Sequence, residues 1–116
     1  YKVRRIINDY IVPPKNEYKL DRALWGMERF RKELSDTVRV GTVHDLFKSF
    51  EIDNIIQCAA MSAHASKARK ESRWGMWHFR TDYPERNDAD FMKHIVLSMG
   101  EAPEDVRINE KDIIRL

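Results

Sequence analysis

The chain has 116 residues, of which 42% are hydrophobic and 34% are charged, enough for one compact domain with a single core. Its 21 Lys and Arg residues exceed its 19 Asp and Glu residues by a net charge of +2, which is too small to favour a general phosphate-binding surface. No apolar run approaches the roughly 18 to 20 residues that a membrane span requires, and no signal peptide is evident at the start. We therefore expect a soluble, cytoplasmic domain without a membrane span.

The single cysteine, Cys58, excludes an intramolecular disulfide and any Cys-rich zinc or iron–sulfur site. We expect it to be buried as a small hydrophobic residue in a chain from a reducing compartment. The four glycines are isolated from one another, so no phosphate-binding loop of the dinucleotide or P-loop type is predicted. The chain is thus not expected to hold a nucleotide cofactor by itself.

Two helices are predicted in the first third of the chain. Apolar residues at helical spacing predict a helix over residues 2–12, which Pro13 and Pro14 end. A second apolar stripe predicts a helix over residues 18–38. Its other face is expected to be solvated, with an ion pair between the residues Glu28 and Lys32. The charged residues of that face are Arg22, Glu28, Arg29, Lys32, Glu33 and Asp36.

A third, longer helix is predicted to start at Thr42 or Asp45, because either side chain can cap it. No glycine or proline follows until Gly75, so this segment is either one long helix or two helices with a break. Its second half is rich in alanine, which predicts close approach of another element. We expect the aromatic part of the core to consist of Trp25, Phe30, Phe47 and Phe50.

The pattern changes after Gly75. Residues 76–83 show neither helical nor alternating periodicity and predict an extended segment. A short turn or helix capped by Asp88 is expected to run through Leu97, and Gly100 and Pro103 then open a tail that can add a strand. The predicted fold is all-α, a three-helix bundle of the spectrin-repeat kind with an extended C-terminal segment.

We expect a single domain over residues 1–116, with the bundle in residues 1–75 and the extended segment, short helix and tail in residues 76–116. Because the chain starts at Tyr1 already in an amphipathic pattern, we expect it to be a piece of a larger protein.

No residue set predicts catalysis or metal binding. His64, His78 and His94 lie in the second half of the chain, but no His-x-x-x-His or Glu-x-x-His pair is present. Cys58 lies in an apolar helical stretch, where burial would raise the pKa of its thiol and make it a poor nucleophile. We therefore assign no catalytic residue, no metal ligand and no cofactor-binding residue.

A basic and aromatic stretch over residues 67–83 is the most unusual feature of the sequence. Arginines beside aromatic rings can bind nucleic acid, but the interleaved acidic residues favour a network of ion pairs. Trp74 and Trp77 exceed what a small core needs, and Trp and Arg are enriched at protein interfaces. The alternatives are a solvated charged face, or rings that close the end of the bundle.

An ordered motif in this stretch resembles the C-terminal helical domain of succinate dehydrogenase and fumarate reductase flavoproteins. The strongest part of the likeness runs from Ala68 to Asp88, and Trp74, Met76 and Trp77 look more like the adenylylsulfate-reductase-like branch. The matching residues are Asp45-Leu46, Glu51-Ile52, Ala68-Arg69-Lys70-Glu71-Ser72-Arg73, Gly75, His78, Arg80, Asp82-Tyr83-Pro84-Glu85-Arg86, Asp88 and Lys93-His94.

The resemblance implies a helical domain that follows an FAD-binding domain and a substrate-capping domain in a parent oxidoreductase. Flavin contacts, hydride transfer and substrate binding are then expected from those other domains, so this chain alone is expected to be inactive and to hold no FAD. Its implied role is to pack on the flavin-binding domain and to contact an iron–sulfur partner or another subunit.

The residues that the resemblance implies for this contact are Arg69, Glu71, Arg73, Trp74, Trp77, His78, Arg80, Asp82, Arg86 and Asp88. A free-standing helical module that binds a protein or a nucleic acid is the alternative, although nucleic acid is not the expected partner.

Overall fold

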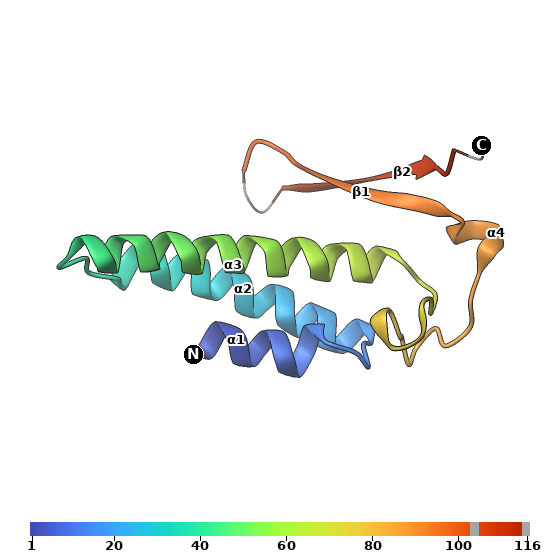
Figure 1. The fold of residues 1–116 in the computed structure, drawn as a ribbon, viewed down its shortest axis with the longest axis horizontal. Coiled ribbons are helices and arrows are strands. Elements are labelled where there is room, and N and C mark those ends of the chain that lie inside the picture. Colours follow the sequence, from blue (N-terminus) through green and yellow to red (C-terminus); the bar gives the residue numbers. More distant parts are fainter. Residues whose placement is uncertain (103–104, 115–116) are drawn as a thin grey trace.

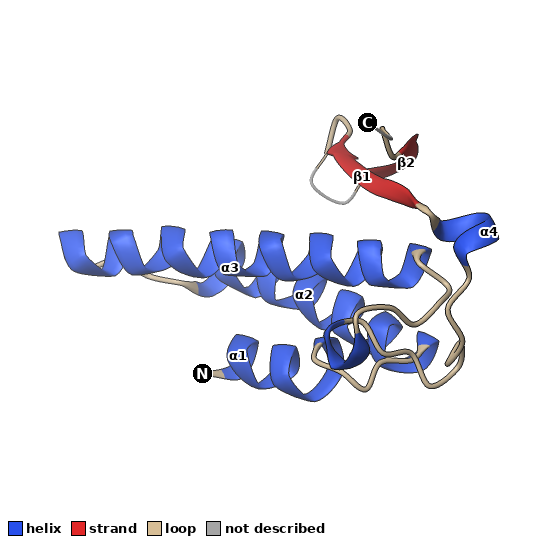
Figure 2. Ribbon diagram, turned by 45° about the vertical axis from the view of Figure 1, so that its right-hand side comes forward, coloured by secondary structure: helices blue, strands red, loops and turns tan. Residues whose placement is uncertain are grey.

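The computed structural model describes residues 1–102 and 105–114, which form an elongated body of 53 × 28 × 22 Å. Three helical segments lie side by side along the long axis, and a β-hairpin lies along the outer side of the longest helix (Figures 1 and 2). The elements in chain order are α1 (Lys2–Ile6), the π-helix η1 (Ile7–Ile11), α2 (Glu17–Thr37), α3 (Val43–Ala68), the 3-10 turn η2 (Gly75–Trp77), α4 (Asp88–Phe91), β1 (Lys93–Met99) and β2 (Val106–Asp112).

The first helical segment extends over the predicted residues but widens from an α-helix into the π-helix η1. It packs on α2 at Gly26, which is buried. A Cβ atom at Gly26 would lie 2.7 Å from Cδ1 of Ile6, so the absence of a side chain allows the two helices to approach closely.

Helices α2 and α3 both start with a side-chain cap. The Asn16 Oδ1 atom accepts a hydrogen bond of 2.8 Å from the Lys19 N–H, and Thr42 and Asp45 form a reciprocal capping box. The helix predicted to begin at residue 42 or 45 is therefore confirmed as one uninterrupted α3. It ends at Ala68 rather than at Gly75, because Arg69 adopts an extended backbone conformation.

The core lies between η1, α2 and α3 and is built from aliphatic residues. Its buried members are Ile11, Leu20, Ala23, Met27, Ile56, Ala59 and Ala63. The small side chains of α3 let the helices approach closely there. Two predictions are wrong, namely that Trp25, Phe47 and Phe50 belong to the core and that Cys58 is buried. Phe47 and Phe50 are 63% and 58% exposed and Trp25 is 52% exposed, while Phe30 packs against the core. Cys58 is exposed, next to the buried Ala59.

The C-terminal quarter corrects the all-α prediction. The short helix α4 ends at Phe91, and residues 93–99 form strand β1 instead of continuing the helix to Leu97. Strand β2 pairs with β1 in antiparallel register, from Lys93 opposite Asp112 to Met99 opposite Val106. The tail thus adds the strand that was predicted, and the fold is a helical bundle with a two-stranded sheet. Pro103 lies outside the described residues.

Residues 76–83 are less extended than predicted. Gly75–Trp77 form the 3-10 turn η2, and two isolated bridges flank it, one between Arg73 and His78 and one between Lys15 and Arg80. The second bridge joins this segment to Lys15, which lies just before α2 in the sequence. The Lys15 N–H donates to Phe79 O, and the Thr81 N–H donates to Lys15 O. The segment is therefore fixed against the bundle end.

Candidate functional site

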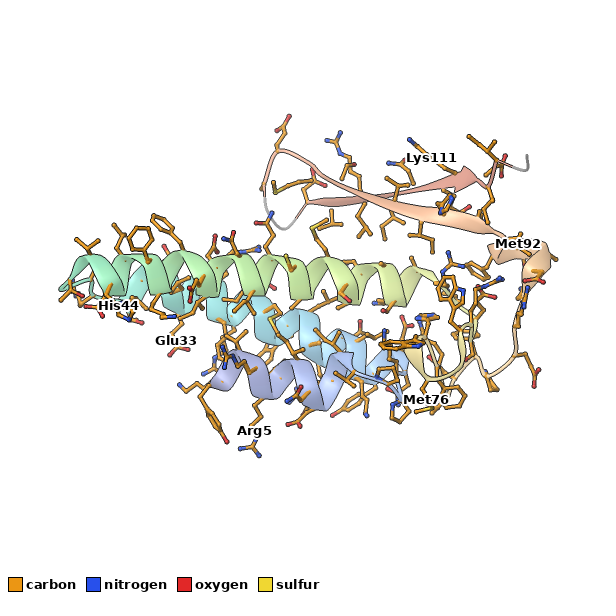
Figure 3. The ribbon with its side chains drawn as sticks, viewed as in Figure 1. Arg5, Glu33, His44, Met76, Met92 and Lys111 are labelled. Carbon is orange, nitrogen blue, oxygen red and sulfur yellow. The ribbon has the colours of Figure 1, made fainter. Side chains whose placement is uncertain are left out.

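The candidate site is the connecting segment, residues 69–87, which joins α3 to α4 at one end of the bundle. In Figures 1 and 3 it lies at the end opposite the α2–α3 loop, with Met76 at the lower side of that end and Met92 where the hairpin begins. This segment contains nine of the ten residues predicted for an interface, and the tenth, Asp88, follows directly.

Glu71 is the centre of the first cluster of charges, and its side chain has no exposed surface. Its Oε1 atom accepts hydrogen bonds of 2.7 Å from both Arg69 Nη1 and Arg73 Nε. Its Oε2 atom accepts from Arg73 Nη2 at 3.0 Å and from the Asn87 N–H at 2.9 Å. Burial alone would raise the pKa of Glu71, but these bonds outweigh it and lower the pKa.

The same cluster fastens the hairpin to the bundle. Arg69 donates to the carbonyl oxygens of Phe91 and Lys93 at 2.9 and 2.7 Å, at the junction of α4 and β1. Arg73 also donates to Asp88 Oδ1 at 2.6 Å, which accepts in turn from Arg86 Nε at 2.7 Å. Two arginines therefore connect the end of α3, the start of α4 and the first residue of β1.

Arg80 is the centre of the second cluster and is completely buried. Its Nη1 atom donates to the carbonyl oxygens of Ser66 and Lys67 in the last turn of α3, at 2.8 and 3.2 Å. Its other nitrogens donate to both carboxylate oxygens of Asp82, at 2.8 and 2.5 Å, and to Glu17 at 3.1 Å. Asp82 accepts in addition from the Glu17 N–H at 2.9 Å.

The charges of this cluster complement the two helix ends that they contact. The guanidinium lies at the carboxyl end of α3, where the helix dipole is negative, and Asp82 lies at the amino end of α2, where it is positive. The hydrogen bond from Arg80 lowers the pKa of Asp82. Burial acts in the opposite direction but is outweighed, so the pKa of Asp82 is lowered. The pair therefore stays ionised and joins α2 to α3.

Two further buried polar residues, Lys15 and His78, lie beside Arg80. The Lys15 Nζ atom donates to Ser66 Oγ at 2.9 Å, and burial together with the Arg80 charge lowers its pKa. The His78 Nε2 atom is 3.2 Å from the Arg69 carbonyl oxygen, an acceptor, so Nε2 carries the proton that it donates. Burial is the main reason why the pKa of His78 is lowered, which keeps the ring neutral.

The apolar residues of the segment point outward while its charged residues bind one another. Trp74, Met76 and Trp77 are 65%, 67% and 85% exposed. Trp74 adopts a left-handed backbone conformation with φ of 58°, and Gly75 follows with φ of 60°. The two residues lie in a sharp reversal of the chain between Arg73 and His78, which form an antiparallel bridge. The two tryptophans therefore do not close the end of the bundle, which was one of the alternatives.

The structure brings the predicted residues together in a definite arrangement. Glu71, His78 and Arg80 are buried, Arg69 and Arg73 are nearly so, and Trp74, Trp77 and Arg86 are exposed. Lys15, Glu17 and Ser66 belong to the same network but were not predicted. The parallel bridge between residues 15 and 80 joins segments far apart in the chain, and no local pattern announces such a contact.

The described residues supply neither a metal site nor a flavin site. Within residues 1–102 and 105–114 no group of three or more metal-ligating side chains comes together, and no helix there is long and apolar enough to cross a membrane. Flavin binding by a dinucleotide fold requires a parallel sheet with a glycine-rich turn, whereas the sheet of this part of the chain is an antiparallel pair. The described part of the chain therefore does not form a dinucleotide-binding fold of this kind.

The sequence matches the family described as fumarate reductase flavoprotein C-term over residues 1–115. The fumarate reductase flavoprotein subunit of Escherichia coli K12 is 30% identical over 105 residues, which cover 90% of this chain and 17% of that protein. The succinate dehydrogenase flavoprotein subunit of Rickettsia felis is 47% identical over 58 residues, which cover 50% of this chain and 9% of that protein.

Two solved structures share the fold. The adenylylsulfate reductase of Archaeoglobus fulgidus matches 98% of this chain and 18% of its own, with a TM-score of 0.90 and 22% identity. The quinol fumarate reductase of E. coli matches 85% of this chain and 17% of its own, with a TM-score of 0.75 and 24% identity. The chain thus spans 9% to 18% of the length of these four proteins, and it belongs to the C-terminal domain family of fumarate reductase flavoproteins.

Proposed function

We propose that the chain is the non-catalytic C-terminal domain of an FAD-dependent oxidoreductase of the fumarate reductase, succinate dehydrogenase or adenylylsulfate reductase type. In this proposal it packs on the flavin-binding domain of the parent through the connecting segment and contributes to contact with an iron–sulfur subunit. FAD is bound by the parent outside this chain, and the parent is a cytoplasmic enzyme.

One observation carries the proposal: a segment held to the bundle by hydrogen bonds and ion pairs, with its buried charges satisfied internally, presents Trp74, Met76 and Trp77 to the outside. Exposed large rings on a fixed backbone cost little conformational entropy when they are covered by another protein surface. Aromatic residues at the centre of a contact, with charged groups around them, are typical of protein interfaces. Of the ten residues predicted for an interface, Trp74 and Trp77 form an exposed apolar part, and buried polar residues such as Glu71 and Arg80 support them from below. Asp82, Arg86 and Asp88 are charged and exposed.

The adenylylsulfate reductase type is our first choice for the parent. The structural likeness to that enzyme has a TM-score of 0.90, against 0.75 for the fumarate reductase of E. coli. The likeness of Trp74 and Trp77 to the adenylylsulfate-reductase-like branch, given by the sequence resemblance, supports the same choice. An assay of the parent with adenylylsulfate, fumarate and succinate would decide between the three substrates.

Hydrogen exchange tests the docking surface directly. We expect the amides of residues 74–83 to exchange more slowly in the intact parent than in the 116-residue chain, because the flavin-binding domain covers them. A parent with both Trp74→Ala and Trp77→Ala should lose this protection, whereas Phe47→Ala, which removes an exposed ring from the far end of the bundle, should not.

Equal exchange rates in the parent and in the isolated chain would contradict the proposal. Tight binding of the isolated chain to nucleic acid, with a steep dependence on salt, would instead favour the free-standing module.

A further inference from the structure

A second surface, outside the connecting segment, lies on α2. Steps of three and four residues repeat with the helical turn, so five residues of this helix share one outward face. This face, here called the α2 stripe, consists of Tyr18, Arg22, Trp25, Arg29 and Lys32. All five are exposed, Tyr18 at 69% and Trp25 at 52%. The stripe therefore presents two aromatic rings and three cations to its surroundings.

The arginines of the stripe are arranged around its tryptophan. The guanidinium carbons of Arg22 and Arg29 lie 5.3 and 5.5 Å from the centre of the Trp25 ring, within the range of cation–π contacts. This arrangement holds two long side chains near a large apolar surface. Less conformational freedom is then lost when a partner binds there.

The cations of the stripe have no carboxylate partner in the part of the chain that the structure describes. None of the ion pairs in that part of the chain includes Arg22, Arg29 or Lys32. By contrast, Asp21, which is also on α2, pairs with Lys67 of α3. The ion pair predicted between Glu28 and Lys32 is absent. The stripe thus differs from the connecting segment, where every arginine between residues 69 and 86 binds a carboxylate.

A groove of about 830 Å³ runs beside the stripe. Trp25, Arg29 and Lys32 line one side of it, and His64 of α3 and Val106 of β2 line the other. Its lining also contains Arg31 and the acidic residues Glu28 and Asp36. The charged residues of the lining therefore sum to +1, with acidic residues among the basic ones. This pattern disfavours a continuous polyanion and suits separate carboxylates.

We propose that the α2 stripe is the docking site for an acidic segment of a partner protein. Carboxylates of that segment pair with Arg22 and Arg29 through the two parallel hydrogen bonds that guanidinium groups form, and an apolar side chain between them covers Trp25. The two arginines are seven positions apart, a rise of about 10 Å along the helix. A partner helix with two acidic residues seven positions apart has the same spacing.

A binding experiment with the 116-residue chain tests this proposal. The probe is a labelled helical peptide of 16 residues with two glutamates seven positions apart and a leucine between them, and the control peptide carries glutamine at both positions. Binding is measured by fluorescence anisotropy at low salt. The three tryptophans of the chain give separate indole N–H signals in an NMR spectrum, which show where the peptide binds.

We expect the glutamate peptide to shift the Trp25 signal and to leave those of Trp74 and Trp77 unchanged. Arg22→Gln and Arg29→Gln should each weaken binding roughly two- to fivefold, as the loss of one exposed ion pair does. Trp25→Ala should weaken it roughly thirtyfold, as the loss of an interface hot spot does. Lys48→Gln, which removes a cation already paired with Glu51, should have no effect.

The proposal would be overturned by the lack of a shift of the Trp25 signal, by equal binding of the glutamine peptide, or by tighter binding of duplex DNA than of the glutamate peptide. A shift of the Trp74 and Trp77 signals alone would also overturn it. None of these results bears on hydrogen exchange of residues 74–83 in the parent, so the two proposals fail separately.

Discussion

Glu71 and Arg80 are charged side chains without exposed surface, and both keep their charge because of specific partners. Glu71 accepts hydrogen bonds from Arg69, Arg73 and the Asn87 N–H, while Arg80 binds Asp82 and the last carbonyl groups of α3. A buried charge whose hydrogen-bonding groups are satisfied is tolerated, whereas the same charge without its partner is strongly destabilising.

Substitution of Glu71 by alanine is therefore expected to lower the free energy of unfolding by about 3 to 5 kcal/mol, because Arg69 and Arg73 lose the carboxylate that they share. Urea denaturation of the chain measures this change. Glu85→Gln is the control, since Glu85 lies in the same segment but is exposed. A Glu71→Ala variant as stable as the control would show that the cluster contributes nothing to folding.

Stability should also depend on the protonation of His78. Burial, followed by repulsion from Lys15, Arg69 and Arg80, lowers the pKa of His78 in the folded chain, although its bond to the Arg69 carbonyl opposes this. The unfolded chain therefore binds the proton more readily, and the free energy of unfolding should fall as the pH drops below about 6.5, the pKa of an exposed histidine. His64, with a pKa lowered mainly by burial, adds to the same trend.

Urea titrations between pH 5 and pH 8 would measure this slope. His78→Gln keeps an N–H group for the Arg69 carbonyl but does not titrate, so its slope should be smaller than that of the unsubstituted chain. An unchanged slope would mean that His78 does not contribute.

At the scale of single elements, α3 shows how position on a helix decides the role of a side chain. Ile56 is completely buried, whereas Phe50, less than two turns earlier, is 58% exposed. Ile56→Ala should therefore lower the free energy of unfolding by about 2 to 5 kcal/mol. Phe50→Ala should lower it by less than about 1 kcal/mol, because a ring that stays in water contributes little burial. Equal losses in the two variants, measured by urea denaturation, would contradict this placement of the core.

The sequence predicts the helices better than it predicts which of their faces is buried. The capping residue Thr42 and the prolines at 13 and 14 act locally, so the helix bounds could be inferred from them. Whether Phe50 or Ile56 is a core residue depends on which face of α3 meets α2. The sequence analysis assigned Phe50 to the core because it is aromatic, and this assignment was wrong. Strand β1 was missed for a similar reason, because its pairing partner begins only at Val106.

The candidate site was likewise predictable in part. Its residues were named from the resemblance to the flavoprotein family, and the alternation of acidic and basic residues in the stretch added only the prediction of a network of ion pairs. Their partners Lys15 and Glu17 could not be found, because the chain returns to them only after two complete helices. The orientation of Trp74 depends on a left-handed backbone conformation that a non-glycine residue rarely adopts.

At the scale of the whole molecule, the hairpin is an addition to a core that does not contain it. All buried core residues belong to η1, α2 and α3, and β1 and β2 lie outside on α3 (Figure 1). A chain that stops at Met92 should therefore retain its helical circular dichroism and a single cooperative urea transition. It should be less stable than the longer chain, because Arg69 loses its bond to the Lys93 carbonyl. Loss of the cooperative transition would show that the hairpin is part of the folding unit.

The Arg80 cluster ties α2 to α3 at one end of a body 53 Å long, and no comparable cluster of buried charges occurs at the opposite end in residues 1–102. At that opposite end the α2–α3 loop, residues 38–42, joins the two helices covalently. The distance between them is limited there by the loop and by side-chain packing rather than by buried ion pairs, so it should vary over a wider range than it does beside the Arg80 cluster. In a Cys58→Ser background, spin labels at positions 35 and 49 should report a broader spread of separations than labels at positions 22 and 62. Any surface of the parent that contacts the α2–α3 loop end would then select among helix separations already sampled, rather than forcing the helices apart.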